Sequence, residues 1–430
     1  MKNLLIALLF VLSSAVQAQT GSTSAVLPFV IKEGAPESAG MSSVKLQQID
    51  KLFQESINKG WMAGASTIII RNGKIVYHKA TGYNDIDSKT PLKRDAIFRI
   101  ASQTKAITSI AVMMLYEEGK LLLDEPVSKY IPEFKNPKVL DSFIVKDSSY
   151  TTKPAKSEIT IRQLLTHTSG LDYPSIGSPK MRAIYAKGGI SSGIGMEYSK
   201  IGDNVKRLAV LPLVRQPGEG FTYSLSTDVL GYLVEVVSGL TLDQFFRQRI
   251  FAPLGMNDTY FYLPKEKYGR LAALYTEDTA THRVKKSPKT VNGFNADYPA
   301  AEGTFYSGGA GLSSTPYDYA LFLQMILNGG EYNGKRLLSR PTVRMILSNQ
   351  LPDPASDFWF GLGFGLVSPR GSAKTPQSEG TFYWGGYFNT TYWADPKEKL
   401  IVVMMKQQVP NTHGDIDEKF KALVYSAINN

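Results

Sequence analysis

The chain has 430 residues, of which 43% are hydrophobic and 20% charged, a composition that excludes disordered and fibrous classes. It contains no cysteine, which excludes disulfides and thiol chemistry. The formal net charge is +10, but the basic residues are scattered along the sequence, so we expect no nucleic-acid partner.

The N-terminal segment is typical of a secretory signal peptide over residues 1–18. It has a basic start, an apolar run from Leu4 to Leu12 and a small-residue exit at Ala18. We therefore expect an exported bacterial protein, periplasmic or secreted, with a flexible leader over residues 19–38. The apolar run is too short to span a bilayer and no later stretch reaches the required ~20 apolar residues, so no integral membrane segment is expected in the mature chain.

Two pairs of β-rich runs, one pair near each end of the chain, predict two hairpins with a helical pattern beside each. The first hairpin turns at an Asn-Gly dipeptide, a strong hairpin signal. The runs are residues 65–70 with 75–79 and residues 390–394 with 400–405, and the helices are residues 43–59 and 416–428.

These elements predict an α+β fold in which both ends of the chain build one antiparallel sheet flanked by helices. We place this α/β domain in residues 39–125 and 320–430. Residues 126–319 are richer in helical patterns and are predicted to form a mainly helical inserted domain.

A candidate nucleophile lies in the apolar stretch of residues 97–115. Ser102 is at the start of a helical pattern, and Lys105 follows at i+3 on the same side. Burying a lysine is costly without a partner, and burial favours the neutral amine, which can take a proton from a serine hydroxyl. Spacing alone is weak evidence, because Ser-x-x-Lys also begins at Ser42 and at Ser56. At those two places we expect the serine and lysine to lie at a helix cap or on the solvent-exposed face of a helix.

Further phrases follow in a fixed order along the chain. A helical pattern over residues 161–170 ends at a glycine. A loop with a tyrosine then precedes a buried helix. A glycine-rich loop and a Trp-Gly-Gly motif come later in the chain. The residues concerned are His167 and Gly170, Tyr223 and Leu225, residues 308–316, and Trp384, Gly385, Gly386 and Tyr387.

From about residue 40 to about residue 408, this ordered set resembles the serine hydrolases that share the class C β-lactamase and penicillin-binding-protein fold. The resemblance is closest to their carboxylesterase branch, esterase family VIII. It implies an antiparallel sheet with helices on both faces, a helical domain packed against it, and an active site in the cleft between them.

The resemblance also implies site residues. Ser102 matches the acylated nucleophile, Lys105 matches its lysine, and Tyr223 matches the tyrosine that shares the role of base. The amides of Ser102 and Tyr387 would form the oxyanion hole, next to the third motif at residues 384–386. Which of Lys105 and Tyr223 is formally the base stays open, because the two groups can share one proton.

Two departures from the β-lactamase pattern bear on specificity. Leu225 stands where the second motif normally has an asparagine, so an amide that would bind an acylamino group is missing. Trp384 stands where the third motif normally has a cation, which removes the group that would bind the β-lactam carboxylate. Both changes favour a carboxylesterase for small ester substrates, with Trp384, Gly385, Gly386 and Leu225 in substrate binding.

Other functions are compatible with the same motifs, and one of them involves no turnover. The protein could be a D-amino-acid peptidase, an amidase or a weak β-lactamase, or a penicillin-binding-like envelope protein that does not turn over. His167 invites a Ser-His-Asp triad, but no nucleophile-elbow motif accompanies it, so we interpret it as structural. The histidines lack ligand spacing, and we expect no metal and no cofactor.

Overall fold

The computed structural model describes residues 29–429 except residues 197, 292 and 354. The expected signal peptide and residues 19–28 of the expected leader lie outside the described residues.

The described part of the expected leader is folded onto the sheet, so the prediction of flexibility does not hold there. Lys32–Glu33 form strand β1, which pairs with β3, and Pro36–Ala39 form a short 3-10 helix. The amide of Lys32 donates to the carbonyl of Gly73 at 3.0 Å, and the amide of Gly34 donates to that of Ile75 at 3.2 Å. Backbone pairing of this kind needs no apolar pattern, so the sequence did not signal it.

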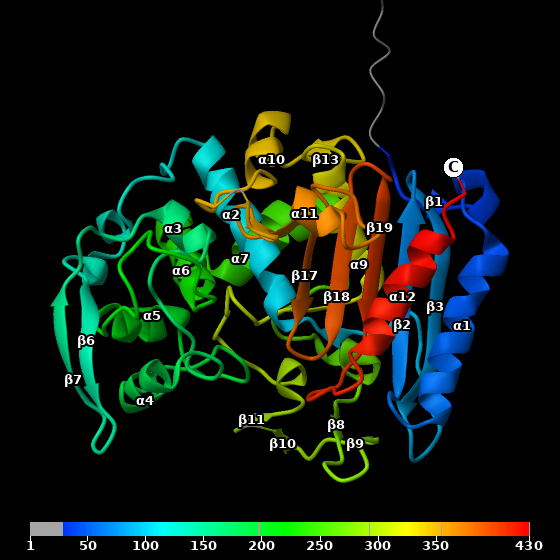
Figure 1. Cartoon of the computed structure of the whole chain (residues 1–430), viewed down its shortest axis with the longest axis horizontal. Coiled ribbons are helices and arrows are strands. Elements are labelled where there is room, and N and C mark those ends of the chain that lie inside the picture. Colours follow the sequence, from blue (N-terminus) through cyan, green and yellow to red (C-terminus); the bar gives the residue numbers. More distant parts are fainter. Residues whose placement is uncertain (1–28, 197, 292, 354, 430) are drawn as a thin grey trace, which may run out of the picture.

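Both ends of the chain build one sheet of nine strands, as predicted (Figure 1). Its centre joins the two ends, because β2 pairs with β19. Every pairing is antiparallel except that of β1 with β3, which is parallel and corrects the fully antiparallel expectation. The strand order is β1, β3 (Lys74–Asp85), β2 (Gly64–Arg71), β19 (Leu400–Met405), β18 (Thr390–Asp395), β17 (Phe382–Gly386), β16 (Gly365–Val367) and β15 (Phe358–Phe360), with β4 (Thr90–Pro91) beside β3.

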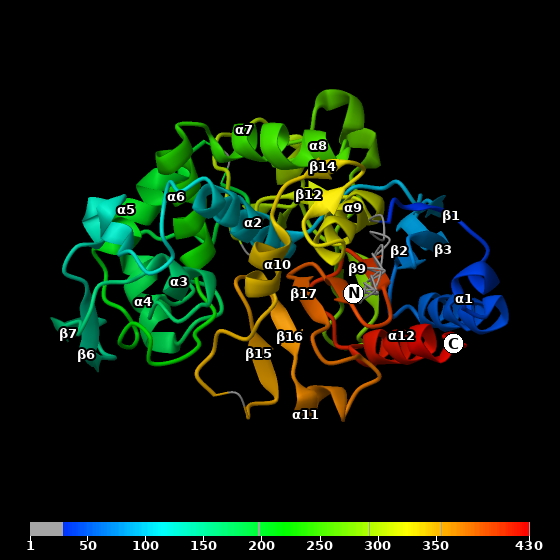
Figure 2. The same ribbon diagram turned by 90° about the horizontal axis from the view of Figure 1, so that it is seen from above.

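Helices cover both faces of the sheet, and the strand alternation sorts the apolar residues between two cores (Figure 2). Helices α1 (Ser43–Asn58) and α12 (Asp415–Ser426) pack on one face, in a core that includes Ile69 and Val402. Helices α2 (Thr104–Glu117) and α9 (Pro316–Leu327) belong to the other core, which includes Ile68 and Val403. The nucleophile helix α2 is therefore buried nearly throughout.

The segment between residues 126 and 319 carries most of the remaining helices and several short hairpins. The first predicted helix there is shorter than expected: α3 ends at Leu165 because the chain reverses at His167, whose φ is +54°. The helices are α3 (Ile161–Leu165), α4 (Pro179–Lys187), α5 (Ile201–Ala209), α6 (Ser226–Ser238), α7 (Leu242–Phe246) and α8 (Ala252–Leu254). The hairpin strands are β6 (Lys138–Ile144) with β7 (Ser149–Pro154), β8 (Tyr275–Glu277) with β9 (Val284–Lys286), and β10 (Thr290–Val291) with β11 (Phe294–Asn295).

Short elements complete the fold around the sheet. They are β5 (Phe98–Arg99) paired with β12 (Ser313–Ser314), β13 (Glu331–Tyr332) paired with β14 (Lys335–Arg336), and helices α10 (Arg340–Ile346) and α11 (Pro369–Ser372). The β5–β12 pair matters most for the site, because β5 leads directly into Ser102 and β12 leads into α9.

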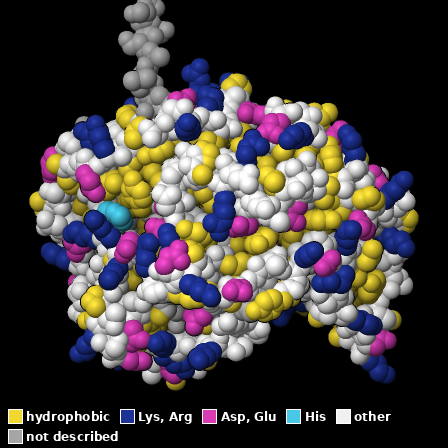
Figure 3. All heavy atoms as spheres, turned by 180° about the vertical axis from the view of Figure 1, so that it is seen from behind, with side chains coloured by type: hydrophobic (Ala, Val, Ile, Leu, Met, Phe, Trp, Pro, Cys, Tyr) yellow, Lys and Arg dark blue, Asp and Glu magenta, His cyan; other side chains and the backbone are white. Residues whose placement is uncertain are grey.

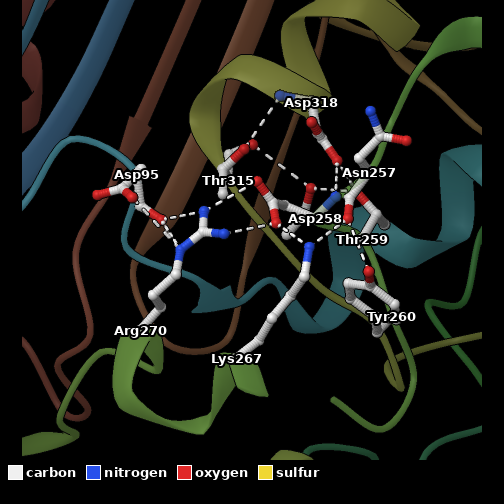
Figure 4. A network of polar contacts seen from close by, with 10 residues as sticks. Asp95, Asn257, Asp258, Thr259, Tyr260, Lys267, Arg270, Thr315 and Asp318 are labelled. Atoms are coloured by element: carbon white, nitrogen blue, oxygen red, sulfur yellow. Dashed lines mark hydrogen bonds and ion pairs between the residues drawn. The ribbon is translucent and has the colours of Figure 1, made fainter. Parts of the chain in front are cut away.

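A polar network ties the first turn of α9 to the segment before it (Figure 4). The buried carboxylate of Asp318 accepts hydrogen bonds from the amide of Asp258 at 2.7 Å and from the hydroxyl of Thr259 at 2.9 Å. Asp258 is in turn paired with Lys267 and Arg270, at 2.6 and 2.7 Å. The network fixes where α9 begins, and hence where β12 runs beside β5, the strand that leads into Ser102.

Basic side chains are scattered among acidic ones on the face of the molecule seen from behind (Figure 3). Within the described part of the chain, no single helix is long and apolar enough to cross a bilayer; a pair formed by α6 with residues 242–254 passes by length and composition only, and it is bent by 80°.

Candidate active site

Strand β5 and the turn after it lead into Ser102. Buried hydrogen bonds hold the strand in place, and the turn has a strained backbone. Arg99 on β5 is fully buried and donates hydrogen bonds to the carbonyls of Ala272 and Ala296, both at 2.7 Å. Ala101 then takes a φ of +41°, which is uncommon for a residue other than glycine and costs on the order of 1 kcal/mol or more. This turn places Ser102 directly before α2.

Two groups from distant parts of the chain converge on the hydroxyl of Ser102. The hydroxyl of Tyr223 lies 2.7 Å from Ser102 Oγ, and Lys105 Nζ lies 3.3 Å from it. Lys105 is only 3% exposed, and its Nζ also donates to the carbonyl of Gly309 at 2.7 Å. The structure thus brings the three predicted catalytic residues together at hydrogen-bonding distance, as nucleophilic catalysis requires.

Aromatic packing fixes the ring of Tyr223. The ring of Tyr173 stacks on it with centroids 5.7 Å apart, and the rings of His167 and Trp384 contact it at 4.9 and 5.6 Å. Lys105 Nζ lies 4.8 Å from the centroid of Tyr223, within the range of a cation–π contact. Tyr173 lies between helices α3 and α4.

His167 contacts Tyr223's neighbour rather than the nucleophile. Its Nδ1 accepts a hydrogen bond from the amide of Ser224 at 3.3 Å and lies 3.2 Å from the hydroxyl of the same residue. Burial lowers the pKa of His167 well below its usual value, and the charge of Lys105 lowers it further, so the imidazole is neutral. These contacts orient the tyrosine loop and give His167 a structural place.

The end of strand β17 lies against the residues that precede Ser102. A Cβ atom on Gly386 would lie 2.3 Å from the carbonyl oxygen of Ile100, so only glycine allows this approach. Tyr387 follows directly after β17 and its side chain is 40% exposed. The approach is compatible with an oxyanion hole made by the amides of Ser102 and Tyr387, which stays a prediction.

The predicted substrate-binding residues divide into two groups. Trp384 is half-buried and packs edge-on against Phe360 with centroids 5.4 Å apart, so it forms an aromatic wall beside Tyr223. Leu225 is different: its side chain is fully buried in the core, and its amide donates to the carbonyl of Asp172. The prediction that Leu225 binds substrate is therefore wrong for its side chain, because the apolar residue turns into the core.

Sequence reasoning missed Asp228, which lies in the first turn of α6 and is 1% exposed. Its Oδ1 accepts hydrogen bonds from the hydroxyl of Ser307 at 2.6 Å and from the amide of Gly309 at 3.4 Å. Burial raises the pKa of Asp228, whereas the charge of Lys105 lowers it. An acidic residue in the first turn of a helix usually serves the helix dipole at the surface, so the sequence offered no sign of burial.

No candidate metal centre accompanies these groups: in the described parts of the chain, three or more His, Asp or Glu side chains nowhere gather as potential ligands. A cavity of about 1070 Å³ lies elsewhere, lined by residues of the β15–β17 region such as Trp359, Leu366 and Gln377. The chemistry, and not the size of a cavity, therefore places the candidate site at Ser102.

Comparison with known proteins decides the family. The family model described as Beta-lactamase matches residues 49–426. The chain belongs to the β-lactamase family. Among its relatives in this family, esterase EstB from Burkholderia gladioli is 31% identical over 378 residues, which cover 83% of this chain and 89% of that protein. Lovastatin esterase from Penicillium rubens is 32% identical over 400 residues, which cover 86% of this chain and 94% of that protein.

A solved structure supports the same placement in the β-lactamase family. EstCE1, described as a hydrolase with promiscuous acyltransferase activity, matches with a TM-score of 0.76 and 28% identity, over 89% of this chain and 98% of that chain. The expected family and the expected α+β fold are thereby confirmed, and the chain is a serine hydrolase of the β-lactamase family.

Proposed function

We propose that this protein is an exported carboxylesterase that cleaves short or medium esters through an acyl-enzyme on Ser102. The observation that carries the proposal is the convergence of Lys105 Nζ and the Tyr223 hydroxyl on Ser102 Oγ, at 3.3 and 2.7 Å. The esterase relatives support the same class of substrate. Export rests on the pattern of residues 1–18, in the segment that the structure does not describe.

Acylation follows from this geometry. The pair formed by Lys105 and Tyr223 takes the proton of Ser102 while Oγ attacks the ester carbonyl carbon. The carbonyl oxygen becomes an oxyanion, for which we assign the amides of Ser102 and Tyr387 as donors, each worth about 3 kcal/mol. The same pair then gives the proton to the alkoxy oxygen as the carbon–oxygen bond breaks. Water repeats the sequence on the acyl-enzyme and releases the acid.

Trp384 supports an ester with an apolar part. Its indole lies against Tyr223 and Phe360, so an apolar acyl or alcohol group could pack beside the nucleophile. An indole carries no positive charge, and it therefore offers little to the carboxylate of a β-lactam. Peptidase, amidase and β-lactamase activities would use the same serine, and the experiment below separates them.

The experiment is a substrate panel with two serine variants. Turnover is measured for p-nitrophenyl esters of increasing acyl length, for nitrocefin and for a peptide ending in D-Ala-D-Ala. We expect ester turnover to dominate and Ser102→Ala to lower kcat by roughly 10³-fold or more. Ser56→Ala is the matched control, because Ser56 begins another Ser-x-x-Lys and its hydroxyl donates to the carbonyl of Leu52 in its own helix.

A fluorophosphonate followed by mass spectrometry should label Ser102. Label at Ser56, or an active Ser102→Ala variant, would refute the proposed nucleophile. Peptide or nitrocefin turnover equal to that of the esters would instead reassign the substrate class. Labelling of Ser102 without turnover of any substrate would indicate a penicillin-binding-like protein.

A further inference from the structure

One buried acidic group next to the candidate site has no role in the mechanism above. Asp228 is 1% exposed, and its Oδ2 has no hydrogen-bond partner among the described residues. Its Oδ1 is bonded by Ser307 and Gly309. A buried carboxylate oxygen without a donor is costly, so an interaction through space must offset part of that cost.

The space beside Gly309 lies between Asp228 Oδ2 and Lys105 Nζ. A Cβ atom on Gly309 would lie 2.4 Å from Asp228 Oδ2 and 3.4 Å from Lys105 Nζ. The carboxylate and the amine therefore border the same small space, which only glycine leaves open. The backbone of Gly309 also links them, because its amide donates to Asp228 at 3.4 Å and its carbonyl accepts from Lys105 at 2.7 Å.

The other titratable groups nearby do not compete for this carboxylate as cations. Tyr173 and Tyr223 have their rings over Lys105, and His167 is kept neutral by burial. Ser307, on the loop that covers Asp228, donates a neutral hydrogen bond at 2.6 Å. Burial raises the pKa of Asp228 above its usual value, and the charge of Lys105 is the largest influence that opposes this rise.

We propose that Asp228 is the buried counter-ion of Lys105, a positioning residue that keeps Lys105 an ammonium and leaves Tyr223 to take the proton of Ser102. The inference deepens the proposed function and rests on Ser102 as the nucleophile. It also differs from the expectation that a buried Lys105 acts as a neutral amine. The carboxylate reverses that expectation, because an opposite charge at close range favours the charged form.

Lys105 and Tyr223 share one proton, and the negative charge of Asp228 favours the form with an ammonium on Lys105 and a phenolate on Tyr223. The phenolate takes the proton of Ser102 as Oγ bonds to the ester carbon. Tyr223 then returns that proton to the leaving alkoxy oxygen when the carbon–oxygen bond breaks. Lys105 keeps its protons throughout, and Asp228 exchanges none.

The test is the pH dependence of ester hydrolysis in Asp228→Asn. The amide has the shape of the carboxylate and can still accept from Ser307, but it carries no charge. We expect kcat for p-nitrophenyl butyrate to fall about 10- to 100-fold with KM changed less than about threefold. Both limbs of the pH–rate profile should move to lower pH, because the variant lacks the negative charge that favours the protonated states of the site.

A matched control separates charge from structure. Asp172 is another buried carboxylate near Tyr173, and its Oδ1 accepts the amide of Tyr173 at 2.8 Å. Asp172→Asn should alter rate or stability without moving the limbs of the profile. A profile of Asp228→Asn that stays in place, or a rate that rises, would overturn the inference; a rise would mean that the neutral amine of Lys105 is the base.

Ser307→Ala gives an independent measurement if Asp228→Asn does not fold. Removing the hydroxyl leaves the carboxylate charged but easier to protonate, so the acidic limb should move to higher pH, opposite to the shift in Asp228→Asn. An acidic limb that stays in place would count against the counter-ion. Ser102→Ala is assayed beside these variants. An active Ser102→Ala would refute the proposed function itself. An inactive Ser102→Ala, together with unmoved pH–rate profiles in Asp228→Asn and Ser307→Ala, would refute only the role of Asp228.

Discussion

The hydroxyl of Tyr223 lies 2.7 Å from Ser102 Oγ although 121 residues separate the two in sequence. Lys105, by contrast, reaches the same oxygen from one helical turn away, at 3.3 Å. One local and one distant group thus converge on the proposed nucleophile, and the rings of Tyr173, His167 and Trp384 pack around the ring of the distant group. Proton transfer should therefore be sensitive to changes at either side of the serine.

The first prediction concerns these two groups. Lys105→Ala and Tyr223→Phe should each lower kcat nearly as far as the loss of Ser102 does, by about 10³-fold, and the double variant should be little worse. Groups that act as a unit give non-additive losses, and steady-state kinetics on one p-nitrophenyl ester measures them. If the two losses multiplied in the double variant, Lys105 and Tyr223 would be acting independently.

His167 provides the contrast. Because it bonds Ser224 and packs on the ring of Tyr223, His167→Ala should lower stability and still retain much of the activity if the variant folds. A His167→Ala variant as inactive as the serine variant, alongside an active Tyr223→Phe, would favour a histidine-based mechanism instead.

The second prediction concerns the close approach of β17 to the nucleophile strand. In Gly386→Ala the new Cβ would lie 2.3 Å from both the carbonyl oxygen of Ile100 and Thr390 Oγ1, so the strand end must shift. We expect kcat to fall by about 10²-fold, because an oxyanion donor at Tyr387 would move. Gly385→Ala is the matched control, since its Cβ would meet only the carbonyl of Thr390, at 3.2 Å. Equal losses in both variants would remove Tyr387 from the mechanism.

The sheet could be predicted because its signals are local. Asn72 and Gly73 have φ values of +53° and +71°, as the turn of a tight hairpin requires, and the apolar alternation fixes which strand face meets which core. Strand β1 could not be predicted, because it pairs through backbone groups and its residues are exposed. Helix α4 was not predicted either, because glycine and serine are frequent on both sides of it.

The site could be predicted in part for a related reason. Ser102 and Lys105 share one helical turn, so their spacing was visible in sequence. Tyr223 required the resemblance to a family, because nothing local links it to Ser102. Asp228 and the carbonyl of Gly309 were missed, since Gly309 contacts Lys105 across 204 residues and a backbone oxygen has no sequence signature. Leu225 was misassigned because a pattern names a position, whereas packing decides where its side chain points.

The third prediction concerns the network that anchors α9. Burial raises the pKa of Asp318 to about 6, against 3.8 for the ordinary group. Since the folded value is the higher one, the stability that this group contributes is fully present below pH 3.8 and is lost as pH rises through 6. Asp318→Asn cannot ionise, so relative to the wild type it should gain about 2 kcal/mol in unfolding free energy between pH 4 and pH 7.

Urea unfolding at several pH values measures this difference, and Asp258→Asn gives a control of opposite sign. Burial alone would raise the pKa of Asp258, but hydrogen bonds from Arg270 and Lys267 bring it below the usual value. Losing this carboxylate should therefore destabilise the protein at pH 7 and cost less at low pH. Parallel pH dependences in the two variants would contradict the assignment of the Asp318 shift to burial.

The last prediction concerns Trp384, the residue that we propose sets the preference for esters over β-lactams. Its indole forms a wall beside Tyr223 and Phe360, with centroids 5.6 and 5.4 Å away, and brings apolar area without positive charge. We expect Trp384→Ala to raise KM for p-nitrophenyl butyrate, or to lower kcat because the ring of Tyr223 loses a neighbour, with Trp384→Phe close to the wild type. Trp384→Lys adds a cation, so the ratio of nitrocefin to butyrate kcat/KM should rise above that of the wild type. A wild type that hydrolyses nitrocefin as efficiently as the ester, or a ratio unchanged by Trp384→Lys, would show that this residue does not set the substrate class.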